Sequence, residues 1–281
     1  MGSPPPDGAE FADRSPGAAA ADGGRDPSPP VFPEGLPVFE KDVTGSTNAD
    51  ALELARHARA PLSLVWARRQ TAGRGRGRRA WDSPEGNLFW TMLVGLEQDR
   101  RPVTGLVFVA SLAAWSTIRA LIPPDRSVQI KWPNDTLVEG RKVSGVLIET
   151  AAGAHGRFAA VGIGVNVTDY PRAGMLYPAS CLRAEGSAAH RNDVLTLLTR
   201  QFVSILERWR TQGFAGLREE YLGAAFRYGE TISVVTGAGS GEIVTGRFVD
   251  VDETGLILQL QDDSRAVIAA GDLIGEPPAA A

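Results

Sequence analysis

Hydrophobic residues recur at the three- and four-residue spacing of an amphipathic helix in several parts of the chain. The clearest case is 191–212, where Val194, Leu198 and Phe202 fall on one face. The segment 104–122 is almost entirely apolar and stops at two consecutive prolines, which cannot continue a helix. The pattern therefore predicts helices over 48–59, 104–122, 191–212 and 214–224.

Short runs rich in β-branched and aromatic residues lie between these helices, as is typical of strands. They cover 63–68, 88–96, 128–132, 135–139, 143–151 and 158–167. Glu139-Gly140 marks a hairpin turn between two of them. Strands and helices that mix in this way, with hairpins, predict an α/β (α+β) domain built on a mixed, largely antiparallel sheet flanked by helices.

The pattern changes after residue 229, where only short strand-like runs remain, separated by turn residues. These runs cover 231–235, 242–251, 255–260 and 265–268, and they predict a small β-barrel. Residues 1–30, in contrast, are rich in Pro, Ala and Gly and cannot bury a core. We therefore expect a disordered tail over 1–35, the α/β domain over 36–226, the barrel over 227–275 and a short tail over 276–281.

Composition narrows the class of protein. The chain has 281 residues and a net charge of -4, so it is not a polycation built to bind nucleic acid. Its longest mostly apolar stretch, 103–115, is shorter than the roughly 20 residues that cross a bilayer, and no secretory signal is visible. The single cysteine, Cys181, cannot form an internal disulfide, which favours a cytoplasmic protein.

Lysine is scarce in this chain. Of 29 basic residues, only Lys41, Lys131 and Lys142 are lysines. Arginine bias of this kind is typical of a GC-rich coding sequence, so a lysine that does occur is more often one whose compact ammonium group is needed. Lys131 begins the motif Lys-Trp-Pro-Asn-Asp at a turn between two predicted strands, where its side chain could reach into a cleft. An ordinary turn with a surface lysine is the alternative.

Arginine is concentrated between Arg68 and Arg79, where six arginines are interleaved with glycines and precede Trp81. Glycine lets the backbone approach a ligand closely, and planar guanidinium groups suit a phosphate. Trp81 could stack on a base. A phosphate-bearing ligand, a nucleic acid and a plain solvated loop all stay compatible with this segment.

Other polar residues stand at the ends of predicted elements. Ser46 and Thr47 are candidate helix caps, and hydroxyl groups there could also bind the polar head of a ligand. Two glycines in the strand 158–167 indicate that something packs flat against it, and Asn166 offers a donor and an acceptor. No cluster of Cys and His suggests a metal site, and no nucleophile–base pair is evident. Catalysis would then depend on positioning and charge, as in attack of a carboxylate on the α-phosphate of a nucleotide.

In their order and spacing, these motifs resemble those of the biotin protein ligases over roughly residues 38–275. They are Ser-Thr-Asn at 46–48, Gln-x-x-Gly-Arg-Gly-Arg from Gln70, Lys-Trp-Pro-Asn-Asp from Lys131, Arg-Lys-x-x-Gly-Val-Leu-Ile-Glu from Arg141, and Gly-Ile-Gly-Val-Asn ending at Asn166. The resemblance implies a catalytic domain followed by an SH3-like barrel. It also implies that biotin and ATP, with Mg²⁺, form biotinyl-5′-AMP, and that the biotinyl group then passes to a lysine of a biotin carboxyl carrier domain, such as that of acetyl-CoA carboxylase.

The resemblance also implies roles for individual residues. Those expected to bind biotin are Ser46, Thr47, Asn48, Gln70, Gly73, Arg74, Arg76, Lys131 and Gly145. Those expected to bind ATP or the adenylate are Arg74, Arg76, Arg79, Trp81, Lys131, Lys142 and Asn166. Lys131 and Arg74 are expected to be catalytic. No protein ligand is expected for a metal.

The chain departs from the family pattern in two places. Gly77-Arg78 inverts the usual Arg-Gly order, so Arg78 receives no role. The DNA-binding module of the bifunctional repressor ligases is missing, so we expect a monofunctional enzyme with neither DNA nor a membrane as partner. The oligomeric state is not fixed, and a homodimer stays open. Two rival functions also stay open: a ligase for lipoate or a related carboxylate, and a nucleic-acid-binding regulator that uses the arginine-rich loop.

Overall fold

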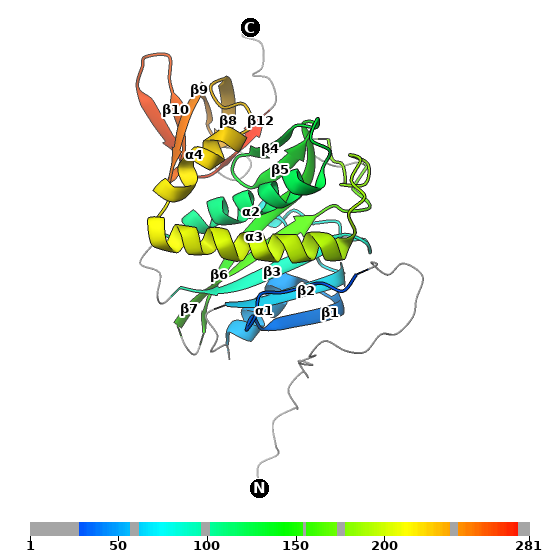
Figure 1. Ribbon diagram of the computed structural model, residues 1–281. Coiled ribbons are helices and arrows are strands. Elements are labelled where there is room, and N and C mark those ends of the chain that lie inside the picture. Colours follow the sequence, from blue (N-terminus) through cyan, green and yellow to red (C-terminus); the bar gives the residue numbers. More distant parts are fainter. Residues whose placement is uncertain are drawn as a thin grey trace.

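The computed structural model describes residues 28–56, 62–96, 102–153, 156–172, 178–236 and 241–274, which form two β-sheets and the helices that cover them (Figure 1). The larger sheet contains β1 (Val38–Thr44), β2 (Leu62–Gln70), β3 (Leu88–Gly95), β4 (Val128–Lys131), β5 (Asp135–Val138), β6 (Arg141–Gly153) and β7 (Gly156–Val165). Its strand order is β1-β2-β3-β7-β6-β5-β4, and neighbours are antiparallel except for the parallel pair β1 and β2. The predicted mixed, largely antiparallel sheet is confirmed.

Helices cover both faces of this sheet because its strands are apolar on both sides. The helices are α1 (Thr47–Ala55), α2 (Gly105–Leu121), α3 (Arg191–Gln212) and α4 (Ala215–Ala224). Trp66 and Trp90 belong to the core shared with α2 and α3, while Val65 and Leu93 belong to the separate core under α1. The Trp90 indole N–H donates to Thr199 Oγ1 on α3 at 3.0 Å, so this buried donor is satisfied. All four predicted helices are confirmed in the described residues.

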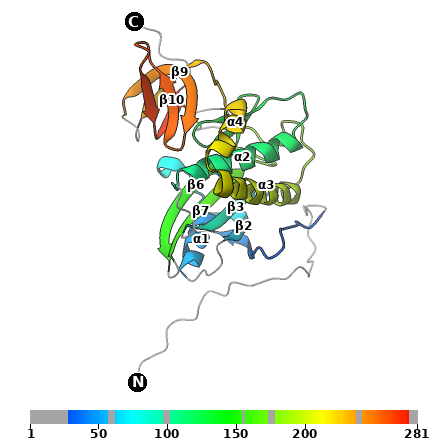
Figure 2. The same cartoon turned by 60° about the vertical axis from the view of Figure 1, so that its left-hand side comes forward.

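The C-terminal sheet lies beside α4, apart from the larger sheet (Figure 2). It contains β8 (Thr231–Thr236), β9 (Ile243–Asp252), β10 (Gly255–Gln259), β11 (Arg265–Ile268) and β12 (Gly271–Ile274). The strand order is β11-β10-β9-β8-β12, with antiparallel neighbours throughout. Val234, Phe248 and Leu258 fill its interior. This confirms the small C-terminal β domain, while the boundaries given to the domains stay a prediction.

The sequence did not predict two of the strands, β1 and β12. Polar and apolar residues do not alternate regularly along β1, which is an edge strand, and β12 has only four residues. Of the tail predicted over 1–35, residues 1–27 lie outside the described residues, and so does the tail predicted over 276–281. Residues 28–35, expected to be disordered, instead lie along α3, where the Val31 N–H donates to Thr196 Oγ1 at 3.0 Å and Phe32 packs on the core. None of the described helices has the length and apolar character needed to span a membrane.

Candidate active site

A cavity of about 670 Å³ lies against the larger sheet, where the start of α1, the loop after β2, the end of β4, the first half of β6 and the last residues of β7 meet. The pairing of neighbouring strands brings these residues, distant in sequence, side by side. The cavity wall contains every residue that the sequence nominated: Ser46, Thr47, Asn48, Gln70, Gly73, Arg74, Arg76, Arg79, Trp81, Lys131, Lys142, Gly145 and Asn166. It also contains residues that the sequence did not nominate, among them Ser83, Asn134, Asp135 and Asp272.

One end of the cavity is an uncharged polar network at the start of α1. Gln70 Oε1 accepts hydrogen bonds from the backbone N–H and the hydroxyl of Thr47, at 2.8 and 3.1 Å. The Thr91 hydroxyl contacts Thr47 Oγ1 and donates to Asn48 Oδ1, both at 2.8 Å. Ser46 takes the N-cap position but its hydroxyl makes no capping hydrogen bond. These buried groups are therefore held in fixed directions, ready to bind a small polar ligand.

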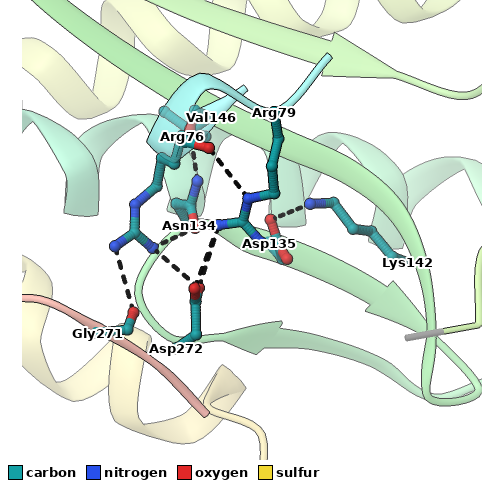
Figure 3. Close-up of polar contacts among 8 residues, drawn as sticks. All are labelled: Arg76, Arg79, Asn134, Asp135, Lys142, Val146, Gly271 and Asp272. Carbon is teal, nitrogen blue, oxygen red and sulfur yellow. Dashed lines mark hydrogen bonds and ion pairs between the residues drawn. The ribbon is translucent and has the colours of Figure 1, made fainter. Parts of the chain in front are cut away.

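The other end of the cavity is cationic. Lys131 ends β4, Asp135 begins β5, and the two are paired across a tight turn. The Lys142 ammonium lies 2.6 Å from Asp135 Oδ1 (Figure 3). Lys131 is only 3% exposed, and this burial lowers the pKa of its ammonium from 10.5 to about 8, although Asp135 opposes the change. A bound anion would recover part of the cost of burying this charge.

Two paired glycines of neighbouring strands, Gly145 on β6 and Gly164 on β7, form a flat patch of backbone in the cavity wall. A Cβ atom added at Gly164 would lie 2.5 Å from the Trp81 ring, and one added at Gly145 would lie 3.0 Å from it. The indole of Trp81 therefore rests directly on these two glycines, and Lys142 lies 5.4 Å from its ring centroid. Gly145 also lines the cavity, and its expected contact with biotin stays a prediction. Asn166 is buried nearby and donates to the Ser180 carbonyl at 3.0 Å, and its expected contact with adenine stays a prediction.

The arginine-rich loop crosses the mouth of the cavity. Gly73 must be glycine, since a Cβ there would lie 2.5 Å from the Trp81 carbonyl oxygen. Gly77 has a φ of 61°, in the left-handed region that favours glycine, so its position in the loop suits a residue without a side chain. Arg74 donates to Glu149 Oε2 at 2.9 Å, and Asn48 donates to the same oxygen at 2.9 Å.

The described residues contain no group of three or more His, Cys, Asp or Glu side chains able to hold a metal ion. Of the residues that the sequence did not nominate, Asn134 and Asp135 lie in the Lys-Trp-Pro-Asn-Asp motif and could have been found there. Asp272 carries no local signal, since only the placement of β12 brings it to the cavity.

Comparisons with known proteins agree with this geometry. The chain matches the Biotin/lipoate A/B protein ligase family over residues 41–166. It is 36% identical over 236 residues to the biotin–[acetyl-CoA-carboxylase] ligase of Paracoccus denitrificans, a match covering 82% of this chain and 97% of that protein. The corresponding ligase of Mycobacterium tuberculosis is 31% identical over 236 residues, covering 82% and 86%. A solved structure of the biotin protein ligase from Aquifex aeolicus in complex with biotin and ATP is similar with a TM-score of 0.70 and 25% identity, covering 84% of this chain and 97% of that one.

Proposed function

The chain belongs to the biotin/lipoate A/B protein ligase family, and on that premise we propose that it is an ATP-dependent biotin–[acetyl-CoA-carboxylase] ligase whose active site is the cavity described above. In the first step, a carboxylate oxygen of biotin attacks the α-phosphorus of ATP, and pyrophosphate leaves. In the second step, a lysine amine of the carrier protein attacks the acyl carbon of biotinyl-5′-AMP. AMP leaves, the amine loses a proton, and an amide bond forms.

The observation that carries this proposal is the pairing of an uncharged polar end with a buried cationic end in one cavity. The network around Thr47 and Gln70 offers fixed donors and acceptors to the ureido group of biotin. Lys131 and Lys142 lie at the end where the carboxylate and the α-phosphate would meet. Two anions must approach each other in the first step, so cations held in a site of low polarity lower the barrier most effectively. The Lys131 ammonium is therefore assigned to the reacting groups.

The arginine-rich loop is assigned to the nucleotide. Arg74, Arg76 and Arg79 line the cavity, and each is bonded to a carboxylate or a carbonyl of the same chain. This arrangement supports closure over the adenylate, which would exclude water from the mixed anhydride. Trp81 and Asn166 are assigned to the adenine.

The partner follows from the activity, and we assign it as the biotin carboxyl carrier domain of a carboxylase. We further propose that the enzyme is monofunctional and does not bind DNA. We also propose that it works in the cytoplasm, because its single cysteine, Cys181, cannot form an internal disulfide and therefore fits a reducing compartment. Mg²⁺ would accompany ATP and would neutralise charge on the phosphates. The described residues provide no carboxylate cage for it.

Exchange of labelled pyrophosphate into ATP tests this function directly. We expect exchange that depends on biotin and is absent with lipoate, because exchange arises when the first step runs forward and back, and this step takes place only with the correct carboxylate bound. The Lys131→Met variant serves as the matched control, since it keeps the length of the side chain without its charge, and it should lose exchange. Exchange with lipoate alone would identify a lipoate ligase. Tight DNA binding without any exchange would identify a regulator.

A further inference from the structure

A carboxylate from the C-terminal sheet reaches the arginine-rich loop. Asp272 is the second residue of β12, and its carboxylate lies 3.6 Å from an Arg76 nitrogen and 3.3 Å from an Arg79 nitrogen (Figure 3). The carbonyl of the adjacent Gly271 accepts a hydrogen bond from Arg76 at 3.2 Å. Two consecutive residues of one short strand therefore bind two arginines of the loop.

The same arginines are also bound on the catalytic side. Arg76 donates to Asn134 Oδ1 at 3.3 Å, in the turn between β4 and β5. Arg79 donates through Nε to the Arg76 carbonyl at 3.0 Å, which fixes the short helical turn of the loop. We call the group Arg76, Arg79, Asn134, Gly271 and Asp272 the clasp. It connects the hairpin that carries Lys131, the loop and the C-terminal sheet.

The clasp differs from a second ion pair, which joins the C-terminal sheet to the catalytic domain at α4. Arg218 on α4 donates to both carboxylate oxygens of Asp250 on β9, at 2.8 and 2.6 Å. That pair involves no residue of the loop or the cavity. Asp272, in contrast, lines the cavity and contacts two cations that would otherwise repel each other.

We propose that Asp272 is a positioning residue, which holds Arg76 and Arg79 so that the loop stays closed over the cavity and retains biotinyl-5′-AMP. This inference rests on the proposed function and assigns part of it to the C-terminal sheet. Asp272 does not touch the reacting atoms. Its negative charge would weaken rather than strengthen the first attraction of ATP, so its benefit appears in retention.

Because Asp272 is expected to disfavour the approach of ATP but to favour retention of the adenylate, its removal should change two kinetic quantities in a characteristic way. Without the charge of Asp272, the KM for ATP should stay the same or fall, because a negative charge near the phosphates has gone. The adenylate should dissociate faster, since the loop is held less firmly. We expect an increase of roughly five- to tenfold, in proportion to the small energies of partly exposed ion pairs. A residue that merely supported folding would change both quantities in the unfavourable direction.

The test compares Asp272→Asn with Asp250→Asn, which removes the ion pair between Arg218 of the catalytic domain and Asp250 of the C-terminal sheet. Release of biotinyl-5′-AMP from preloaded enzyme should be about five- to tenfold faster in Asp272→Asn. It should be unchanged within twofold in Asp250→Asn, and near wild type in Asp272→Glu. Equal release from the wild type and Asp272→Asn would overturn the proposal, and so would equal acceleration in both Asn variants.

A second measurement does not depend on adenylate formation. Trypsin cleaves after arginine, so cleavage after Arg76 and Arg79 in the ligand-free protein reports how firmly the loop is held. Asp272→Asn should be cut faster within the loop than Asp250→Asn, as judged from fragment masses. If the wild type formed no adenylate from biotin and ATP, the proposed function would be wrong, but the cleavage rates would still test whether Asp272 holds the loop. If cleavage within the loop were the same in Asp272→Asn and the wild type, the role of Asp272 would be wrong while the proposed function still stood.

Discussion

The charge of Lys131 should control how adenylation depends on pH. Because burial lowers the pKa of Lys131 from 10.5 to about 8, the ammonium of the free enzyme begins to lose its proton within the range of ordinary assays. With this pKa, about nine tenths of the molecules carry the charge at pH 7 and about one tenth at pH 9, so kcat/KM for ATP should fall roughly tenfold between these values. Biotin carboxylate stays ionised throughout this range and does not contribute.

The assay is biotin-dependent exchange of pyrophosphate into ATP, measured at limiting ATP from pH 6.5 to 10. Lys131→Arg keeps a charge that does not titrate, so its rate should be low but independent of pH. Lys41→Arg is the matched control, because Lys41 is a partly exposed lysine paired with Asp50, and it should keep the wild-type profile. A wild-type rate that stays constant to pH 10, or near-normal activity in Lys131→Arg, would refute the reasoning.

The same titration should appear in stability. The unfolded chain keeps this proton up to about pH 10.5, while the folded protein keeps it only up to about pH 8. The unfolded state therefore binds more protons between these values, and the free energy of unfolding should rise with pH there. The pKa difference corresponds to roughly 3 kcal/mol, at about 1.4 kcal/mol for each pH unit. Urea denaturation at pH 7.5 and 10 should show this increase in the wild type but not in Lys131→Arg.

Three further predictions follow from contacts around the cavity and behind it. Arg76→Gly removes the clasp arginine with its bonds to both domains, so the adenylate should escape on the order of 30-fold faster, with biotin appearing on free amines in solution. Gly164→Ala forces a Cβ to within 2.5 Å of the Trp81 ring, so thermal melts should show a loss of about 1–3 kcal/mol and the KM for ATP should rise. Burial alone would raise the pKa of Glu185, but hydrogen bonds from Arg141 and Ser180 lower it overall, so its contribution to stability is present at neutral pH and is lost as the pH falls through that lowered value. Glu185→Gln should therefore cost about 2 kcal/mol in urea denaturation at pH 7 and progressively less in acid.

Much of the catalytic sheet and the cavity could be predicted from local patterns. Lys131, Asn166 and Thr47 are distant in sequence, yet each stands at the end of an element whose type was evident from its periodicity. Backbone pairing places Lys131 opposite Asp135, Asp135 opposite Gly145 and Gly145 opposite Gly164, so motifs distant in sequence lie in one row across neighbouring strands. The elements that escaped prediction are those whose pattern is set by their neighbours. β1 forms because β2 offers a parallel partner, and β12 because β8 offers an edge.

The contacts inside the cavity could not be predicted in the same way. Nothing near Asp272 in the sequence distinguishes it from other acidic residues of the C-terminal segment. Its position depends on how the two sheets are placed relative to each other, which is decided by tertiary packing. The same holds for Trp81: the glycines of the strands indicate a close approach, but not that the Trp81 ring makes it. The local sequence pattern indicates which residues face the cavity, but not which of their side chains contact each other.

The placement of the three lysines has a consequence for the enzyme itself as an acceptor. An acyl adenylate reacts with any uncharged primary amine, whereas guanidinium groups stay protonated and do not react at neutral pH. Lys131 lies in the cavity but carries its charge in about nine tenths of the molecules at pH 7, Lys142 is paired with Asp135, and Lys41 lies beside Asp50. A catalyst with arginine in place of nearly every surface lysine offers its own product few side-chain amines to label. Self-biotinylation should therefore be slow, and adenylate that escapes would modify neighbouring proteins before it modified the ligase.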